Sequence, residues 1–357
     1  MNSRKQSLDV LRGVAVLMVI VNHYAIVVPH GERTMLDIGG AGVDLFFVLS
    51  GFLISGLLFA EFKATGKLDV KRFWIRRGFK IYPSFYALMG ATAMLALVRA
   101  HRIPPQLLTE SVFLQNYFSR FWPHTWSLAV EEHFYFSLPL LLLVLAAIGK
   151  GKDNPFRALP AISVALSGLC LYLRIVAVRH GADWSGVAFP THLRIDALFA
   201  GVTLGYFFHF DHESFVEARR WWVLATGVAF ASAFLFLPDV PRLTVAYIAF
   251  SFIVAWTVTR NPSKRLPVRS LAWIGRYSYS IYLWHGFAIF ALERMAPRWF
   301  RFPAYVLGAI VIGTTMSKLI ELPPLRVRDR LFCAVPQSRN CLPVASQGSS
   351  AAVLESS

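Results

Sequence analysis

Long apolar runs separated by short polar segments repeat along most of the chain, and they predict its fold class. A helix needs about 20 mostly apolar residues to cross a bilayer, within a range of roughly 17–25. Ten runs approach that length, at residues 10–28, 39–60, 79–98, 133–148, 158–178, 194–210, 221–237, 243–258, 277–292 and 304–320. Because lipid offers the backbone of such a run no other hydrogen-bond partner, the pattern predicts an all-α, polytopic membrane bundle of about ten transmembrane helices.

The distribution of positive charge predicts how this bundle is oriented. Lys and Arg crowd the segments 63–77, 150–157, 260–276 and 326–330, and each intervening loop carries three at most. Since cytoplasmic loops carry the excess of Lys and Arg, both termini are predicted to face the cytoplasm. The long loop 99–132 then faces outside, and we expect a multi-pass protein of the bacterial inner membrane.

Composition supports the membrane interpretation and disfavours a rival one. Of the 357 residues, 56% are hydrophobic and 16% are charged, against roughly 25% charged in soluble domains. The net charge of +16 could suggest nucleic acid, but a nucleic-acid footprint is clustered, whereas these charges lie in alternate loops. Membrane lipids are therefore expected partners, and nucleic acid is not.

The chain is predicted to form one membrane domain over residues 1–330, followed by a Ser- and Ala-rich cytoplasmic tail over 331–357 that is disordered. The first apolar run is interpreted as an uncleaved span rather than a signal peptide, because Arg12 and His23 lie inside it. The three cysteines have no metal-ligand spacing, so neither a metal nor a disulfide framework is predicted.

Ionisable residues inside the first two runs are candidates for chemistry, because such residues are costly in lipid and usually functional. Arg12 and His23 lie eleven residues apart, which returns a helix nearly to the same face with a rise of about 16 Å. Asp44 lies as far into the second run as His23 lies from the end of the first, so antiparallel helices would bring both to one depth. A carboxylate there can fix the imidazole tautomer and raise its basicity; an isolated structural ion pair is the alternative.

A basic cluster opens the third apolar run. Arg76, Arg77 and Lys80 come at the start of the run, on the side predicted to be cytoplasmic. Cations at an inner membrane surface suit the phosphate groups of a cytoplasmic ligand. Membrane anchoring and contact with lipid headgroups explain the same charges, and the charges alone do not separate these readings.

Further candidates lie near the outer ends of the fourth and sixth runs. Glu131 and Glu132 precede the fourth run, where they could orient a base, bind a sugar hydroxyl or complement the helix dipole. Trp126 could stack on a sugar ring or belong to the aromatic belt of the membrane interface. Arg194 and Asp196 open the sixth run, and because positions i and i+2 do not face each other on a helix, each needs a partner elsewhere.

Seven segments of the chain, taken in order, resemble the acyltransferase-3 family of membrane O-acyltransferases. They are Arg12 and His23 with ten residues between them, GVDLFFVLSGFLI at 42–54, RRGFKIYP at 76–83, WSLAVEEHFY at 126–135, LRIDALFAG at 193–201, SYSIYLWH at 278–285 and IELP at 320–323. The resemblance covers residues 8 to about 325. One position departs from it, since the family usually has Arg where this chain has Lys80, which keeps the charge and loses the bidentate fork.

The resemblance implies a fold of about ten helices around a central pore. It also implies cytoplasmic acyl-CoA, most often acetyl-CoA, as a co-substrate, with no permanently bound cofactor. Family acceptors include lipopolysaccharide, exopolysaccharide and peptidoglycan. By the same resemblance His23 is the base, and Arg12, Arg77 and Lys80 lie on the donor side.

The residues and the resemblance together predict an integral-membrane O-acyltransferase that moves an acyl group, acetyl first among the candidates, from acyl-CoA to a hydroxyl of an envelope or exported glycan or glycolipid. His285, near the middle of the ninth run, is interpreted as a packing residue rather than a second base. The predicted site residues are His23, Asp44 and Glu131 for catalysis, Arg12, Arg76, Arg77 and Lys80 for acyl-CoA, and Trp126, Arg194 and Asp196 for the acceptor.

A transporter or flippase is the main alternative function. Intramembrane Arg, Asp and His residues would then form a proton or substrate pathway. Broken helices paired between repeated halves would favour a transporter, and the sequence contains no such repeat. Whether the acyl group passes directly or through an acylated intermediate is left open by the sequence.

Overall fold

The computed structural model describes residues 3–27, 38–260, 263, 265–292 and 300–332. Every regular element in these residues is a helix. The main helices are α1 (Ser3–Val27), α3 (Gly42–Thr65), α4 (Val70–Ala100), α5 (Gln106–Ser111), α6 (Trp126–Ile148), α7 (Leu159–Arg179), α8 (Trp184–Ala188), α9 (Ile195–Phe210), α10 (His212–Val216), α11 (Trp221–Ala233), α12 (Asp239–Val258), α13 (Leu266–Arg276), α14 (Ser278–Leu292), α15 (Arg301–Met316) and α16 (Leu322–Leu331). The tail predicted to be disordered lies, from residue 333 on, outside the described residues.

The prediction of a polytopic helical membrane protein is confirmed. Seven of the described helices are long and apolar enough to cross a membrane, and two shorter apolar helices, Ile195–Phe210 and Trp221–Phe236, accompany them. Each of the ten apolar runs falls on a helix. The count of ten spans and the orientation of the termini remain predictions.

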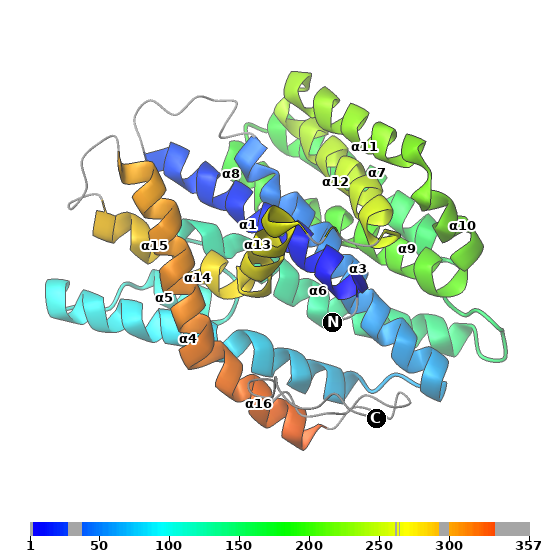
Figure 1. The fold of residues 1–357 in the computed structure, drawn as a ribbon, viewed down its shortest axis with the longest axis horizontal. Helices are drawn as coiled ribbons and strands as arrows, with labels where there is room; N and C mark the ends of the chain where they lie inside the picture. The colour runs from blue at the N-terminus through cyan, green and yellow to red at the C-terminus, as the bar shows by residue number, and fades with distance from the viewer. Residues whose placement is uncertain (1–2, 28–37, 261–262, 264, 293–299, 333–357) are drawn as a thin grey trace, which may run out of the picture.

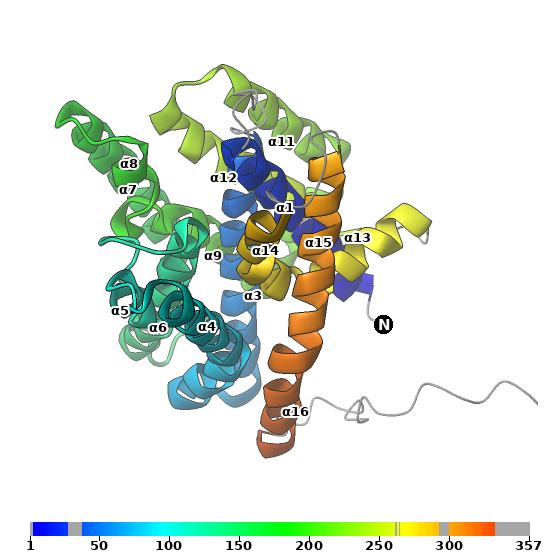
Figure 2. The same cartoon turned by 90° about the vertical axis from the view of Figure 1, so that its left-hand side faces the viewer.

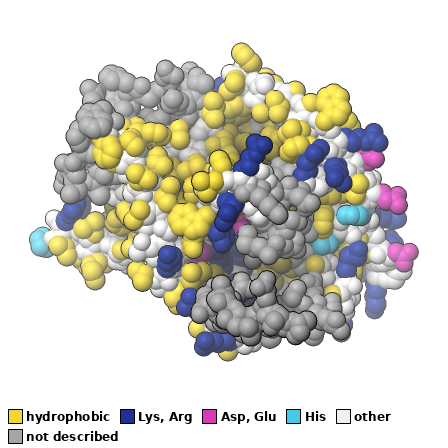
Figure 3. Space-filling view, in the orientation of Figure 1, with side chains coloured by type: hydrophobic (Ala, Val, Ile, Leu, Met, Phe, Trp, Pro, Cys, Tyr) yellow, Lys and Arg dark blue, Asp and Glu magenta, His cyan; other side chains and the backbone are white. Residues whose placement is uncertain are grey.

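The surface of the bundle matches a lipid environment. Large apolar side chains such as Val98, Val164, Trp221 and Phe236 are between 72% and 85% exposed. Figure 3 shows broad hydrophobic areas on one face of the molecule, with Lys and Arg side chains scattered between them, in the centre as well as toward the right and the lower edge. Contiguous apolar surface of this kind is unusual on a soluble monomer and is expected where lipid covers the protein.

Helix α3 forms the centre of the fold. It packs against α1, α6, α9 and α12, and Figure 1 shows it between a group made of α7 and α9–α12 and a group made of α4–α6. Glycines permit its close crossing with α9, since a Cβ atom at Gly51 would overlap the carbonyl oxygen of Leu198, and one at Gly201 would overlap that of Val48. Small residues of this kind let helix backbones approach closely in membranes.

Two features of the fold were not visible in the apolar pattern. The basic segment after the eighth run contains α13, which packs against α1. The helix formed by the last apolar run does not end at residue 320. Helix α15 continues through a π-helical turn, Ser317–Glu321, into α16. Figure 2 shows α15 and α16 as one long column beside α14. These features bring charged residues of distant segments to the interior described next.

Candidate active site

Two cavities meet inside the bundle. A cation-lined cavity of about 110 Å³ contains Arg12, Arg77, Lys80 and Arg276, and a histidine-lined cavity of about 640 Å³ contains His23, His124 and His285. Val43 of α3 and Tyr282 of α14 line both cavities. Both cavities therefore reach these two residues, which lie on their common boundary.

A polar network anchors the cation-lined cavity. Arg77 donates to the hydroxyl oxygen of Tyr135 and lies over its ring, with 4.1 Å from the guanidinium carbon to the ring centroid. The Tyr135 hydroxyl donates to Glu131 at 2.6 Å, and Ser50 donates to the same carboxylate at 2.8 Å. The Nε of Arg77 is buried and has no hydrogen-bond partner among the described residues, so this guanidinium keeps one donor for a ligand.

Lys80 reaches the same cavity from one turn further along α4. It forms an ion pair with Glu321, whose carboxylate also accepts hydrogen bonds from Ser280 and Ser317. Arg12 lies 3.7 Å from Asp9, one turn earlier on α1. The cavity thus collects four cations from three helices, α1, α4 and α13, an arrangement suited to phosphate groups.

The structure corrects two of the predicted positions on this side. Arg76 does not line the cavity; it donates to the carbonyl oxygen of Phe332 at 2.7 Å, because adjacent residues on a helix point about 100° apart. Glu131 does not lie with His23; it lines the cation-lined cavity instead. The reason is that α6 begins at Trp126, so Glu131 lies more than a helical turn inside the span rather than at its start.

Three imidazoles form a cluster in the histidine-lined cavity. The ring centroids of His23 and His285 are 4.8 Å apart, those of His124 and His285 are 4.5 Å apart, and those of His23 and His124 are 5.9 Å apart. They come from α1, from the turn before α6 and from α14. Sequence reasoning missed His124, which lies just before the Trp126 segment and carries no spacing that links it to His23.

Backbone carbonyls fix the tautomers of these histidines. Nδ1 of His23 lies 2.9 Å from the carbonyl oxygen of Val19, and Nδ1 of His285 lies 2.5 Å from that of Tyr282. Because a carbonyl oxygen only accepts, each Nδ1 carries the proton and each Nε2 keeps a lone pair. Nε2 of His124 faces the carbonyl oxygen of Leu283 at 3.2 Å, which leaves the lone pair of this ring on Nδ1. His23 therefore presents an unprotonated nitrogen, as a general base must.

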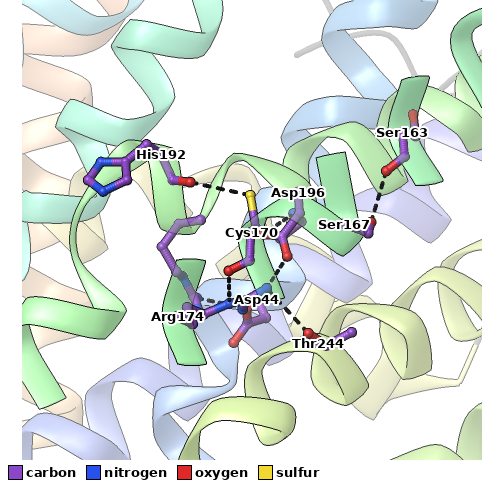
Figure 4. A network of polar contacts seen from close by, with 10 residues as sticks. Asp44, Ser163, Ser167, Cys170, Arg174, His192, Asp196 and Thr244 are labelled. Carbon is purple, nitrogen blue, oxygen red and sulfur yellow. Dashed lines mark hydrogen bonds and ion pairs between the residues drawn. The ribbon is translucent and has the colours of Figure 1, made fainter. Parts of the chain in front are cut away.

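The expectation that Asp44 orients His23 is wrong. Asp44 accepts from Arg194 at 2.7 Å, and both side chains line the histidine-lined cavity. Asp196, predicted at the acceptor site, lines neither cavity; it is paired with Arg174, which also donates to Thr244 at 3.2 Å (Figure 4). Arg194 and Asp196 each found a partner on another helix, as their i, i+2 spacing required.

Arg174 is a functional candidate that sequence reasoning missed. Its side chain is 0% exposed, and its one sequence signal was a charge inside the fifth apolar run. A cation at such a position usually has a buried partner, and here that partner is Asp196. The pair ties α7 to α9 beside the wall of the histidine-lined cavity.

The turn that carries His124 is held by a buried carboxylate. Oε1 of Glu110, on α5, accepts from the backbone N–H of Phe121 at 2.9 Å and of Trp122 at 2.7 Å. Burial raises the pKa of Glu110 above its ordinary value.

Trp126, at the start of α6, lines the histidine-lined cavity and stacks on Phe189 with ring centroids 4.7 Å apart. Trp122, Trp126 and Phe189 thus line the same cavity as the histidine cluster.

Fold and site together define a helical membrane protein whose interior holds a cationic and a histidine-lined cavity in contact. The chain belongs to the family whose model is described as an acyltransferase domain, and this model matches residues 5–320. The chain is 28% identical to the peptidoglycan O-acetyltransferase OatA of Listeria monocytogenes over 353 residues, covering 89% of the chain and 55% of that protein. It is 26% identical to the O-acetyltransferase OatA of Staphylococcus aureus over 373 residues, covering 93% and 59%.

The chain therefore spans little more than half the length of these curated relatives. No solved structure matches it.

Proposed function

We propose that the chain is an integral-membrane O-acyltransferase that moves an acetyl group from cytoplasmic acetyl-CoA to a hydroxyl of a cell-envelope glycan. The observation that carries the proposal is the contact between the two cavities at Val43 and Tyr282. Acetyl-CoA held in the cation-lined cavity and a glycan held in the histidine-lined cavity would meet beside Nε2 of His23. The names of the relatives, a peptidoglycan O-acetyltransferase among them, support acetyl as the group and a glycan as the acceptor.

The cation-lined cavity suits the donor. Arg12, Arg77 and Arg276 together offer several guanidinium donors, which pair well with phosphate oxygens. Coenzyme A is a cytoplasmic compound, and the excess of basic loops on the predicted cytoplasmic side supports a donor that enters this cavity from there. The acyl end would then point toward Tyr282.

The histidine-lined cavity suits a sugar. Trp122, Trp126 and Trp184 contribute aromatic faces to it, and Arg194 and Asp44 contribute polar edges. Ligand cavities of this kind combine apolar walls with a few polar groups that orient the ligand. Lipopolysaccharide, exopolysaccharide and peptidoglycan all offer sugar hydroxyls, and the relatives favour peptidoglycan as the first acceptor to try.

The reaction follows from these positions. The acceptor hydroxyl oxygen attacks the thioester carbonyl carbon while Nε2 of His23 takes the hydroxyl proton. A C–O bond forms, the C–S bond breaks, and the proton passes from His23 to the departing sulfur, so that free coenzyme A leaves. Holding both reactants in the reactive geometry contributes further to the rate enhancement.

The proposal is tested with the purified full-length chain in nanodiscs. Acetyl-CoA and soluble peptidoglycan fragments are supplied, released thiol is measured, and mass spectrometry detects the acetyl ester. We expect thiol release and ester formation in equal amounts. A transporter, the alternative, would move a labelled glycan or acyl compound across proteoliposomes without consuming thioester, and that result would overturn the proposal.

A further inference from the structure

The histidine cluster, made of His23, His124 and His285, presents hydrogen-bond acceptors to its cavity, while its N–H donors are already used. Each ring donates its one N–H to a backbone carbonyl, so three lone pairs remain in one cavity. Nε2 of His285 is buried and has no partner among the described residues, and the side chain as a whole is 1% exposed. A buried acceptor without a donor is costly, and it marks a place where a ligand can supply the missing hydrogen.

Several donors near the cluster, among the described residues, are directed elsewhere. The hydroxyl of Tyr282 donates to the carbonyl oxygen of His124 at 2.5 Å, and the indole N–H of Trp122 donates to Thr92 at 2.9 Å. Arg194 donates to Asp44 through Nη2, and its Nε has no hydrogen-bond partner among the described residues. A molecule that enters the cavity can supply the hydrogen that His285 Nε2 accepts, and hydroxyl groups are donors that a glycan has in number.

We propose that His285 accepts a hydrogen bond from a second hydroxyl of the acceptor while His23 takes the proton of the reacting hydroxyl. The proposal rests on the proposed function and names the acceptor class more closely, as a saccharide with two hydroxyls near each other rather than a single alcohol. The ring centroids of His23 and His285 are 4.8 Å apart, so one sugar can contact both imidazoles. His285 thereby becomes a specificity-determining residue instead of a packing residue.

The experiment removes acceptor hydroxyls one at a time. Wild-type protein in nanodiscs receives acetyl-CoA and, as acceptor, methyl β-D-glucopyranoside or one of its 2-, 3-, 4- and 6-deoxy analogues. We expect the analogue that lacks the reacting hydroxyl to be inert. A second analogue should lose roughly three- to tenfold in kcat/KM, which is the usual effect of one hydrogen bond.

The variant His285→Phe connects that second hydroxyl to His285. It should lower kcat/KM for the parent glycoside by the same factor and abolish the difference between the parent and the second analogue. His285→Gln, whose amide oxygen can accept, should restore part of the difference. His192→Phe is the matched control, because His192 stacks on Tyr117 and lines neither cavity; its deoxy pattern should equal that of the wild type.

Three results would overturn the inference. The first is a wild-type scan in which only the analogue without the reacting hydroxyl loses activity, and this result needs no variant to fold. The second is an unchanged deoxy pattern in folded His285→Phe. The third is the absence of transfer to any glucoside while peptidoglycan fragments are still acetylated, which leaves the proposed function intact. Absence of all thioester turnover would instead contradict the proposed function itself.

Discussion

The hydroxyl of Tyr282 donates to the carbonyl oxygen of His124 at 2.5 Å and lies 2.6 Å from the Ser127 hydroxyl oxygen. These bonds fix the Tyr282 ring between α14 and the start of α6, at the boundary that both cavities share. The ring therefore forms part of the partition between the proposed donor and acceptor sides.

Truncating this ring should connect the two cavities. In Tyr282→Ala we expect water to reach the donor, so that acetyl-CoA hydrolysis without acceptor rises relative to transfer by an order of magnitude or more, since a site that excludes water prevents such side reactions. Tyr282→Phe, which keeps the ring, should hydrolyse much less acetyl-CoA without acceptor than Tyr282→Ala. The measurement is thiol release with and without acceptor. Tyr305→Phe, a buried tyrosine outside both cavities, is the control, and equal coupling in Tyr282→Ala and wild type would contradict the partition.

Loss of the His23 imidazole should stop transfer without unfolding the protein. We expect His23→Ala to lower the rate about 10²–10⁴-fold, the usual contribution of a general base, while donor binding and membrane yield stay near normal. Acyl transfer and acetyl-CoA binding are measured in parallel on the same nanodisc preparation. Near wild-type turnover would remove His23 from the mechanism, and loss of both binding and yield would assign it a structural role.

Arg77 and Arg76 offer a matched pair of substitutions on one helix. Arg77→Ala should weaken acetyl-CoA binding by about 1.5–3 kcal/mol, or roughly 10- to 150-fold in Kd, because hydrogen bonds to charged groups are worth this much. Arg76→Ala should change Kd little, since Arg76 donates to Phe332 outside the cavity. Binding is measured by calorimetry. Equal effects of the two substitutions on Kd would contradict a donor-binding role for Arg77 and would favour a role of both cations in membrane orientation.

The buried pair of Arg174 and Asp196 should matter for stability. Arg174→Met leaves the Asp196 carboxylate without its partner, and breaking a buried pair in this way costs about 3–5 kcal/mol. The double variant Arg174→Met with Asp196→Leu should recover much of this loss, because no uncompensated charge remains. Denaturation in detergent measures the effect, with the exposed Arg179→Met on the same helix as the control. A single variant as stable as the control would argue against the pair.

Loop charge predicts the orientation of the two cavities. Reporter fusions at residues 66 and 265 should read cytoplasmic, and fusions at 110 and 183 should read external. The fusion at 110 is the most informative, because Glu110 bonds the segment that lines the histidine-lined cavity. A cytoplasmic reading there would reverse the two sides and remove the basis for a donor on the cationic side.

The sequence predicted part of the set of charged residues that line the interior cavities. The cations Arg12, Arg77 and Lys80 were predicted together, and the structure brings them to one cavity. That inference came from the position of the cations at the predicted inner surface and from the family resemblance, and in the structure residues 77 and 80 lie on one face of α4. The same reasoning failed for Arg76 because an apolar run fixes the ends of a helix only loosely and does not fix which face turns inward.

The sequence by itself determined the class of fold, because the length of an apolar run decides whether a helix can cross a bilayer, and this is a local property. Only the tertiary structure decided which polar groups meet. Asp44 finds Arg194, 150 residues further on, rather than His23, and His124 joins His285 across 161 positions. Such partners depend on which helices cross and at what depth, as at Gly51 and Gly201, where the absence of a side chain lets α3 and α9 touch. Packing of this kind involves every helix at once, and no single segment encodes it.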